Sequence, residues 1–148
     1  MSLSEVDRGH LVRCVELAEE ALVAADGTVL AEDRNRIAGG DSTRHPEFEL
    51  ARWAAEHMAP ADRPAATVYT SGEHCPMCSA AHAWVGLGRI VYASSSAQLA
   101  EWLTELGVAP GPVATLPVTV VAPGIPVDGP DEELSARVRE LHVRLHRG

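Results

Sequence analysis

Residues 67–78, TVYTSGEHCPMC, are the stretch that decides how this chain folds. The run from Thr67 to Thr70 has the β-branched and aromatic content of a short strand. Ser71-Gly72 then turns the chain into Cys75-Pro76-Met77-Cys78, which begins a helix that continues over 80–87. A strand that passes directly into a helix is typical of an α/β layered domain.

Strands and helices alternate on both sides of this stretch. We expect, in chain order, a helix over 5–20, strands at 22–24 and 28–30 joined by an Asp26-Gly27 hairpin turn, a helix over 47–57, a strand over 89–93, a helix over 97–106, a strand over 118–121 and a helix over 131–147. At 148 residues the chain is expected to be a single domain, 1–148, with one continuous core.

Composition argues against several classes of protein. Hydrophobic residues make up 46% and charged residues 22%, which is typical of a globular, soluble chain. No apolar run approaches the roughly 20 residues of a membrane span, and the first residues lack the pattern of a signal peptide. The formal charge of -9 argues against nucleic acid as the main partner, because binding to its phosphates depends on lysine and arginine.

Two short motifs supply the ligands of a metal site, His45-Pro46-Glu47 and Cys75-Pro76-Met77-Cys78. Each stands at an expected helix start, where exposed amides favour thiolate over thiol. Together they offer one imidazole, two thiolates and a spare carboxylate. A structural zinc ion is closed by four protein ligands, whereas a catalytic one keeps its fourth position for water. The three ligands His45, Cys75 and Cys78 therefore predict a catalytic zinc site.

Glu47 is the carboxylate left over once these three ligands are assigned. It can take a proton from the water on zinc and return it to a ring nitrogen and then to a departing amine. The resulting zinc-bound hydroxide would attack an amidine-like carbon, and ammonia would leave. Glu47 is thus the expected catalytic residue of a hydrolytic deaminase.

The C-x-x-C motif also has other interpretations. By itself it occurs as a redox motif of thioredoxin-like proteins, or without function. The redox interpretation leaves His45-Pro46-Glu47 unexplained. Three cysteines do not make a disulfide framework, so a reducing, cytoplasmic setting is expected. Cys14 lies among apolar residues of the first helix and is expected to be a small core residue.

The two motifs and their surroundings resemble the cytidine and deoxycytidylate deaminase superfamily, specifically its guanine deaminase, cytosine deaminase and tRNA adenosine deaminase branch. The resemblance covers about residues 28–93 and rests on three blocks, 41–47 (DSTRHPE), 69–78 (YTSGEHCPMC) and 88–93 (GRIVYA). It implies a three-layer α-β-α fold, with a mixed sheet of about five strands between helices. It also implies a homodimer, with zinc held by His45, Cys75 and Cys78 and with Glu47 as proton shuttle.

Three positions depart from the family's pattern. His74 stands where proline is usual, and it either reaches the substrate pocket or caps the turn. Pro46 replaces the usual alanine, a change expected to be tolerated at a helix start. Between Glu20 and Ala21 the family usually carries a loop that lines the pocket. This loop is either lost or omitted from the sequence, and omission is the favoured interpretation.

The resemblance also bears on the substrate. Asn35 stands where such enzymes commonly place an asparagine that hydrogen-bonds the base. Trp84 lies six residues after Cys78, in a region where this chain resembles the guanine deaminases more than the tRNA or cytosine enzymes. Its indole would either stack on a purine or belong to the core. Guanine also needs a carboxylate for its N–H groups. Candidates for that carboxylate lie in the tail, namely Asp128, Asp131, Glu132 and Glu133.

Three functions from different classes remain open. The first is a zinc hydrolase that deaminates a small-molecule nucleobase or related heterocycle, with a guanine-like base favoured. The second is a tRNA adenosine deaminase, for which Arg34, Arg36 and Arg44 form the nearby basic cluster. The third is a non-catalytic, zinc-stabilised interaction domain. Glu47 argues against the third, because a structural zinc site has no use for that carboxylate.

Overall fold

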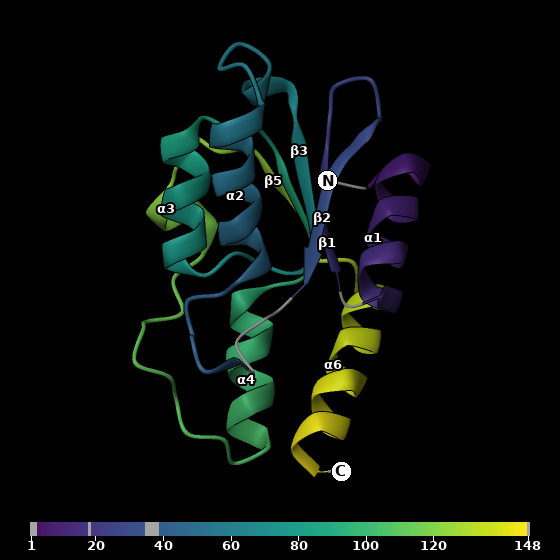
Figure 1. The fold of residues 1–148 in the computed structure, drawn as a ribbon. Coiled ribbons are helices and arrows are strands. Elements are labelled where there is room, and N and C mark those ends of the chain that lie inside the picture. Colours follow the sequence, from purple (N-terminus) through teal and green to yellow (C-terminus); the bar gives the residue numbers. More distant parts are fainter. Residues whose placement is uncertain (1–2, 18, 35–38, 148) are drawn as a thin grey trace.

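A computed structural model describes residues 3–17, 19–34 and 39–147 of the chain. Within these residues a five-stranded sheet lies between two layers of helices (Figure 1). Across the sheet the strands run in the order β2-β1-β3-β4-β5. Their bounds are Glu19–Val23 for β1, Val29–Arg34 for β2, Thr67–Gly72 for β3, Ile90–Ser94 for β4 and Val127–Asp128 for β5. The predicted three-layer α-β-α fold with a mixed sheet of five strands is therefore confirmed.

Six α-helices and one short 3-10 turn, η2 (Arg63–Ala65), accompany the strands in the described residues. The α-helices are α1 (Glu5–Leu17), α2 (Pro46–His57), α3 (Pro76–Val85), α4 (Ser96–Glu105), α5 (Val118–Val121) and α6 (Glu132–Arg147). Helices α1 and α6 pack on one face of the sheet, and α2 packs on the other with α3 beside it (Figure 1). None of these helices is long and apolar enough to cross a membrane.

Strand directions follow from the connections between the strands. Strands β1 and β2 form an antiparallel hairpin, and Gly27 at its turn has a φ of 91°, which favours glycine. Strand β1 also pairs antiparallel with β3. By contrast β3, β4 and β5 are parallel, because a helix or a long loop returns the chain between them. The carboxyl ends of β3 and β4 therefore lie at the same edge of the sheet.

The side chains of β1 alternate between the two faces of the sheet. Ala21 and Val23 belong to the core cluster on the side of α1, and Leu22 belongs to the cluster on the side of α2. Because successive strand residues point to opposite faces, Glu20 points to the α2 side, like Leu22. This alternation places the carboxyl group of Glu20 on the face of the sheet that α2 covers.

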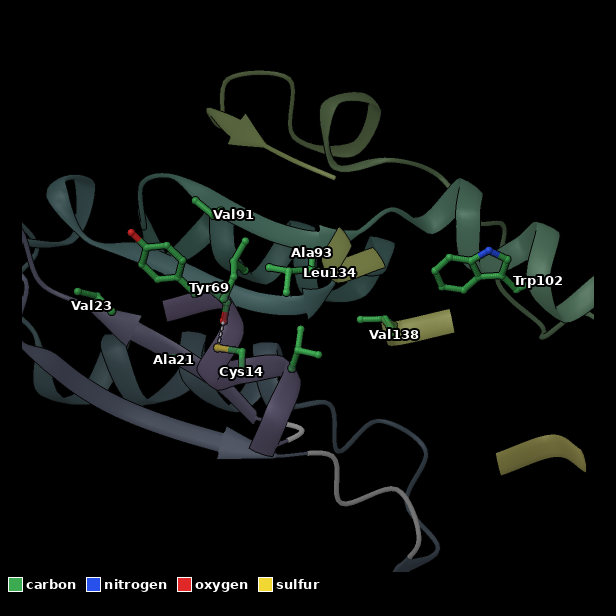
Figure 2. Packing of buried hydrophobic residues seen from close by; sticks show 11 residues of the cluster. Cys14, Ala21, Val23, Tyr69, Val91, Ala93, Trp102, Leu134 and Val138 are labelled. Atoms are coloured by element: carbon green, nitrogen blue, oxygen red, sulfur yellow. Dashed lines mark hydrogen bonds between the residues drawn. The ribbon is translucent and has the colours of Figure 1, made fainter. Parts of the chain in front are cut away.

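A core cluster fills the space between the sheet and the helices α1 and α6 (Figure 2). Its buried residues include Leu11, Cys14, Val15, Ala21, Val23, Tyr69, Val91, Trp102, Leu134 and Val138. The thiol of Cys14 donates a hydrogen bond of 3.6 Å to the carbonyl oxygen of Tyr69, drawn as a dashed line in Figure 2. The structure thus confirms that Cys14 is a small residue of the core.

Two of the predicted elements were wrong in detail. The segment Val118–Val121, expected as a strand, is the short helix α5, and the fifth strand is Val127–Asp128. The sequence of residues 118–121 is compatible with either a strand or a helical turn. In the structure, the backbone N–H of Val118, the first residue of α5, donates a hydrogen bond to the carboxylate of Glu73. The first helix ends at Leu17 because residues 19 and 20 already pair with β2.

Candidate active site

Three metal-ligating side chains meet at the N-terminal ends of two helices. His45 is the N-cap residue of α2, Cys75 is the N-cap residue of α3, and Cys78 lies in the first turn of α3. The Nδ1 atom of His45 lies 3.5 Å from the Sγ atom of Cys75 and 3.6 Å from that of Cys78. The two sulfur atoms are 3.5 Å apart. The structure therefore brings together the three residues that the sequence predicts as ligands.

The dimensions of this triangle fit a zinc ion. Bonds of about 2.3 Å to sulfur and about 2.0 Å to nitrogen, at tetrahedral angles, separate ligand atoms by roughly 3.5–3.8 Å. Hydrogen bonds from the Cys78 thiol and from the Cys78 backbone N–H lower the pKa of Cys75 to about 5. These hydrogen bonds favour the thiolate form of Cys75, which is the form that binds a metal.

Close packing of α2 against α3 brings the three ligands together. Ala51 and Ala54 of α2 are almost completely buried in the core cluster against which Ala81 and Val85 of α3 pack. Pro46 and Pro76 occupy the first positions of the two helices, where no intrahelical amide donor is needed. The substitution of proline for the usual alanine at position 46 is thus compatible with the helix start.

The carboxyl group of Glu47 lies one residue past the start of α2, on the sheet side of the ligand triangle. Its Oε1 atom is 3.1 Å from the Oγ1 atom of Thr70 on β3. Burial raises the pKa of Glu47, and hydrogen bonds with Glu20 and Thr70 partly offset this effect. A carboxyl group whose pKa is raised by burial is a suitable proton carrier.

A cavity of about 380 Å³ opens beside the ligand triangle. Its polar lining is formed by Glu20, His45, Glu47, Ser71, Glu73 and Cys75. A second, mainly apolar part of the lining, the apolar wall, is formed by Val15, Leu99, Val138, Leu141, His142 and Leu145. A concave site with an apolar wall and a few convergent polar groups is typical of small-molecule binding.

The residues predicted to contact the substrate are not gathered around this cavity. His74 is completely buried, packs edge-on to His82 with 5.4 Å between the ring centroids, and does not line the cavity. Trp84 is 89% exposed at the end of α3 and also lies outside the cavity lining. A stacking role for Trp84 is therefore not supported within one chain. Asn35 lies outside the described residues.

The carboxylates of the tail, considered as readers of a guanine base, are engaged elsewhere. Asp128 forms an ion pair of 2.6 Å with Arg89, and Asp131 forms one of 3.0 Å with Arg8. Glu133 also approaches Arg8, at 3.3 Å. None of the tail carboxylates, Glu132 included, lines the cavity among the described residues.

Two site residues were missed because the start of β1 was misplaced. With the strand beginning at Glu19, strand alternation would have placed Glu20 on the same face as Leu22 and thus near Glu47. Thr70 carried no motif of its own. The expected break between Glu20 and Ala21 falls inside β1, and whether a segment is omitted from the sequence stays a prediction.

Three curated proteins are similar to this chain over part of its length. A probable cytosine deaminase of Schizosaccharomyces pombe is 27% identical over 119 residues, which cover 73% of this chain and 72% of that protein. A guanine deaminase of Bacillus subtilis is 32% identical over 82 residues, covering 55% of this chain and 53% of that protein. A tRNA-specific adenosine deaminase of Agrobacterium fabrum is 34% identical over 73 residues, covering 49% of this chain and 48% of that protein. The chain therefore aligns with only about half the length of the last two proteins.

Solved structures share the fold over nearly the whole chain. A guanine deaminase from Nitrosomonas europaea has a TM-score of 0.70 at 23% identity, covering 100% of this chain and 87% of that chain. A mutant protein in complex with 8-azaguanine has a TM-score of 0.72 at 23% identity, covering 95% of this chain and 84% of that chain. At these identities the likeness shows the fold alone. No protein-family model matches the chain.

Proposed function

We propose that this chain is a member of the cytidine and deoxycytidylate deaminase superfamily and acts as a zinc-dependent hydrolase that deaminates a nucleobase or related amino-heterocycle. A guanine-like purine base is the favoured substrate. The observation that carries this proposal is the position of Glu47, whose side chain lines the same cavity as the ligands His45 and Cys75.

Each residue has a defined task in this reaction. His45, Cys75 and Cys78 would hold the zinc ion, which would supply the Lewis acidity that makes water a nucleophile at neutral pH. Glu47 accepts a proton from the attacking water and passes it to a ring nitrogen of the substrate. A second proton transfer through Glu47 then reaches the amino group, which leaves as ammonia. A C–O bond replaces the C–N bond, and one water is consumed.

Two observations support a free base as the substrate. The cavity of about 380 Å³ lies toward the small end of the roughly 300–1,000 Å³ found for small-molecule sites. Its apolar side would contact the faces of a planar ring, whereas a sugar and phosphate would require further polar or basic groups. A guanine deaminase is among the relatives, which supports guanine as the first base to test.

A tRNA adenosine deaminase is the second candidate, motivated by the relative with that name. Its substrate would need a basic surface near the cavity. The described lining instead carries three glutamates and no lysine or arginine. Arg44 forms an ion pair of 3.0 Å with Glu49, and Arg36 lies outside the described residues. These features favour the small-molecule substrate.

A non-catalytic zinc domain is the third candidate. It would be favoured by a fourth protein ligand, since structural zinc sites are closed. In the described part of the chain, no fourth histidine, cysteine or carboxylate joins the group of His45, Cys75 and Cys78. The three-ligand set, with Glu47 beside it, supports the catalytic proposal instead.

We also propose that the protein acts as a homodimer in the cytoplasm. The family resemblance supports the dimer, and Trp84, which is 89% exposed, is a large apolar side chain that a second copy could cover. A reducing compartment would keep Cys75 and Cys78 available as metal ligands.

The test of the proposed function is ammonia release by zinc-loaded protein. The panel comprises guanine, cytosine, adenine, their nucleosides and a tRNA anticodon stem-loop. Glu47→Gln should keep zinc and lower turnover by roughly 10²–10⁴-fold, because the proton carrier is lost. Glu49→Gln, two residues further along the same helix, is the matched control and should retain turnover. Ammonia release from none of these compounds, or undiminished turnover by Glu47→Gln, would contradict the proposal.

A further inference from the structure

Glu20 and Glu47 come from different layers of the fold and meet at a single hydroxyl group. The Oγ1 atom of Thr70 lies 3.1 Å from Oε1 of Glu20, 3.1 Å from Oε1 of Glu47 and 2.8 Å from the carbonyl oxygen of Gly72. Thr70 is completely buried, and Glu20 is 6% exposed. The side chains of both glutamates line the cavity beside the metal ligands.

The number of protons at this junction is limited. A threonine hydroxyl has one proton to donate and two lone pairs to accept with. Three oxygen atoms surround it, and the nearest, the carbonyl oxygen of Gly72, can only accept. The single hydroxyl proton cannot serve three acceptors. A proton on one of the two carboxyl groups would relieve this shortage, because a hydrogen bond between Glu20 and Glu47 needs a donor.

The surroundings indicate that Glu20 is the protonated member of the pair. Its Oε2 atom is inaccessible to solvent and has no hydrogen-bond partner that would stabilise a charge. A buried, unpaired ionised carboxylate is costly, so such a group is held in its neutral form. Burial and the negative charge of Glu47 both raise the pKa of Glu20 well above its ordinary value. Glu47 is more exposed and borders the metal ligands, where an ionised base is required.

We propose that Glu20 is a positioning residue for Glu47: together with Thr70, it holds the carboxyl group of Glu47 in one orientation beside the ligand triangle. This inference rests on the proposed function, because it assigns Glu20 a task in the proton transfer carried out by Glu47. Glu20 itself need not touch the substrate. A fixed proton carrier avoids the loss of rate that follows when a reacting group is displaced by about 1 Å.

Other charged groups near Glu20 come from several elements. Glu47 approaches from α2, and Asp33 of the neighbouring strand β2 adds further negative charge. His45 borders Glu47, and His142 of α6 lines the same cavity. The two acidic neighbours favour the neutral form of Glu20, which is the form able to donate a hydrogen bond.

The test compares Glu20→Gln, Glu20→Ala and the control Glu16→Gln, which changes an exposed glutamate at the end of α1. Glutamine keeps both a donor and an acceptor at this position, whereas alanine has neither. We expect Glu20→Ala to lower kcat per bound zinc by about 100-fold, with little change in KM. Glu20→Gln should restore most of this loss. A role in folding alone would lower the zinc-loaded fraction without changing kcat per zinc.

A second measurement does not depend on turnover. In protein labelled with 13C at the glutamate side chains, one carboxyl resonance of the wild type should keep the protonated form to a higher pH than the other glutamates do. That resonance should be absent in Glu20→Gln and present in Glu16→Gln. This measurement tests Glu20 even if no base on the panel is deaminated, in which case the proposed function fails separately.

Four results would overturn the inference. Glu20→Ala would show wild-type kcat, or Glu20→Gln would be as impaired as Glu20→Ala, or no glutamate of the zinc-loaded wild type would stay protonated to a higher pH than the others. A higher kcat in Glu20→Ala would also overturn it, because Glu20 would then obstruct the cavity rather than orient Glu47.

Discussion

The carboxylate of Glu73 accepts a hydrogen bond of 2.8 Å from the backbone nitrogen of Val118, 45 residues further along the chain. Its other oxygen accepts a hydrogen bond of 2.9 Å from the backbone nitrogen of Ser96 at the start of α4. One side chain therefore joins the turn that precedes Cys75 to both α4 and α5. The orientation of the metal-binding turn depends on segments that carry no ligand.

Glu73→Ala should destabilise the protein by about 2–4 kcal/mol, because two backbone N–H groups lose a charged acceptor. Glu73→Gln, which keeps one acceptor oxygen, should cost about half as much. Urea unfolding followed by circular dichroism measures both effects. Equal stability of Glu73→Ala and wild type would show that water replaces the carboxylate without cost.

Metal removal should destabilise the folded chain, and variants of Cys75 and Cys14 should differ in their response to it. A ligand present at about 1,000 times its Kd stabilises the native state by about 4 kcal/mol, so a chelator should lower the Tm. Cys75→Ala should remove both the bound zinc and this response to the chelator. Cys14→Ala, a change in the core, should lower the Tm but keep both. Metal analysis and calorimetry of the three proteins check this expectation.

Gly88→Ala should be among the most damaging single substitutions. A methyl group there would overlap the backbone carbonyl oxygen of Pro64 and lie 2.8 Å from that of Ala66. Because backbone atoms cannot move aside as a flexible side chain can, a loss of about 3 kcal/mol or more is expected. The control is Gly9→Ala, which meets no atom within 4 Å in helix α1 and should stabilise the protein by about 0.5–1 kcal/mol. Similar thermal stability of the two variants would contradict this prediction.

Stability at acidic pH should depend on Asp7. This buried carboxylate accepts hydrogen bonds from both terminal nitrogens of Arg89, at 2.8 and 3.0 Å, and one of 2.7 Å from the Tyr69 hydroxyl. The hydrogen bonds from Arg89, and then those from Tyr69 and Ser4, lower the pKa of Asp7 far below its ordinary value. The unfolded state then binds the proton more readily, so the stabilisation is complete above about pH 4 and is lost as the pH falls toward the folded-state pKa.

Asp7→Asn should therefore reduce stability at neutral pH and flatten its decline on acidification. Asp62→Asn, which changes an exposed loop carboxylate, serves as the control and should leave the acid decline as it is in the wild type. Denaturant midpoints measured between about pH 2 and about pH 7 distinguish the two variants. An unchanged acid slope in Asp7→Asn would show that other carboxylates determine the decline.

The grouping of His45, Cys75 and Cys78 was predictable because each of them stands in a short local motif. His45 and Cys75 are N-cap residues, and the proline after each one marks the helix start in the sequence itself. The spacing of Cys75 and Cys78 within one helical turn fixes their separation without knowledge of the fold. Only the contact between α2 and α3, which joins the two motifs, had to come from the tertiary structure.

The rest of the site depends on contacts between distant segments. The local sequence predicts that Glu20 lies at the end of the first helix. Only its pairing with β2 shows that it belongs to β1. Val118–Val121 was predicted as a strand because its three valines and one threonine are compatible with both a strand and a buried helical turn. The hydrogen bond from its first N–H to Glu73 is invisible to local patterns. Contacts of this kind between distant residues decide between helix and strand where the local propensity allows both.

The apolar wall of the cavity contains residues 138–145 of α6, whereas every metal ligand lies within the first 78 residues. During synthesis on the ribosome, the three ligands therefore emerge well before the wall does. A nascent chain that has reached residue 78 already contains all three candidate ligands, whereas the α6 side of the cavity is still missing. If the proposed function is correct, the residues that would hold the metal are therefore made before the helix that supplies much of the apolar lining for a base.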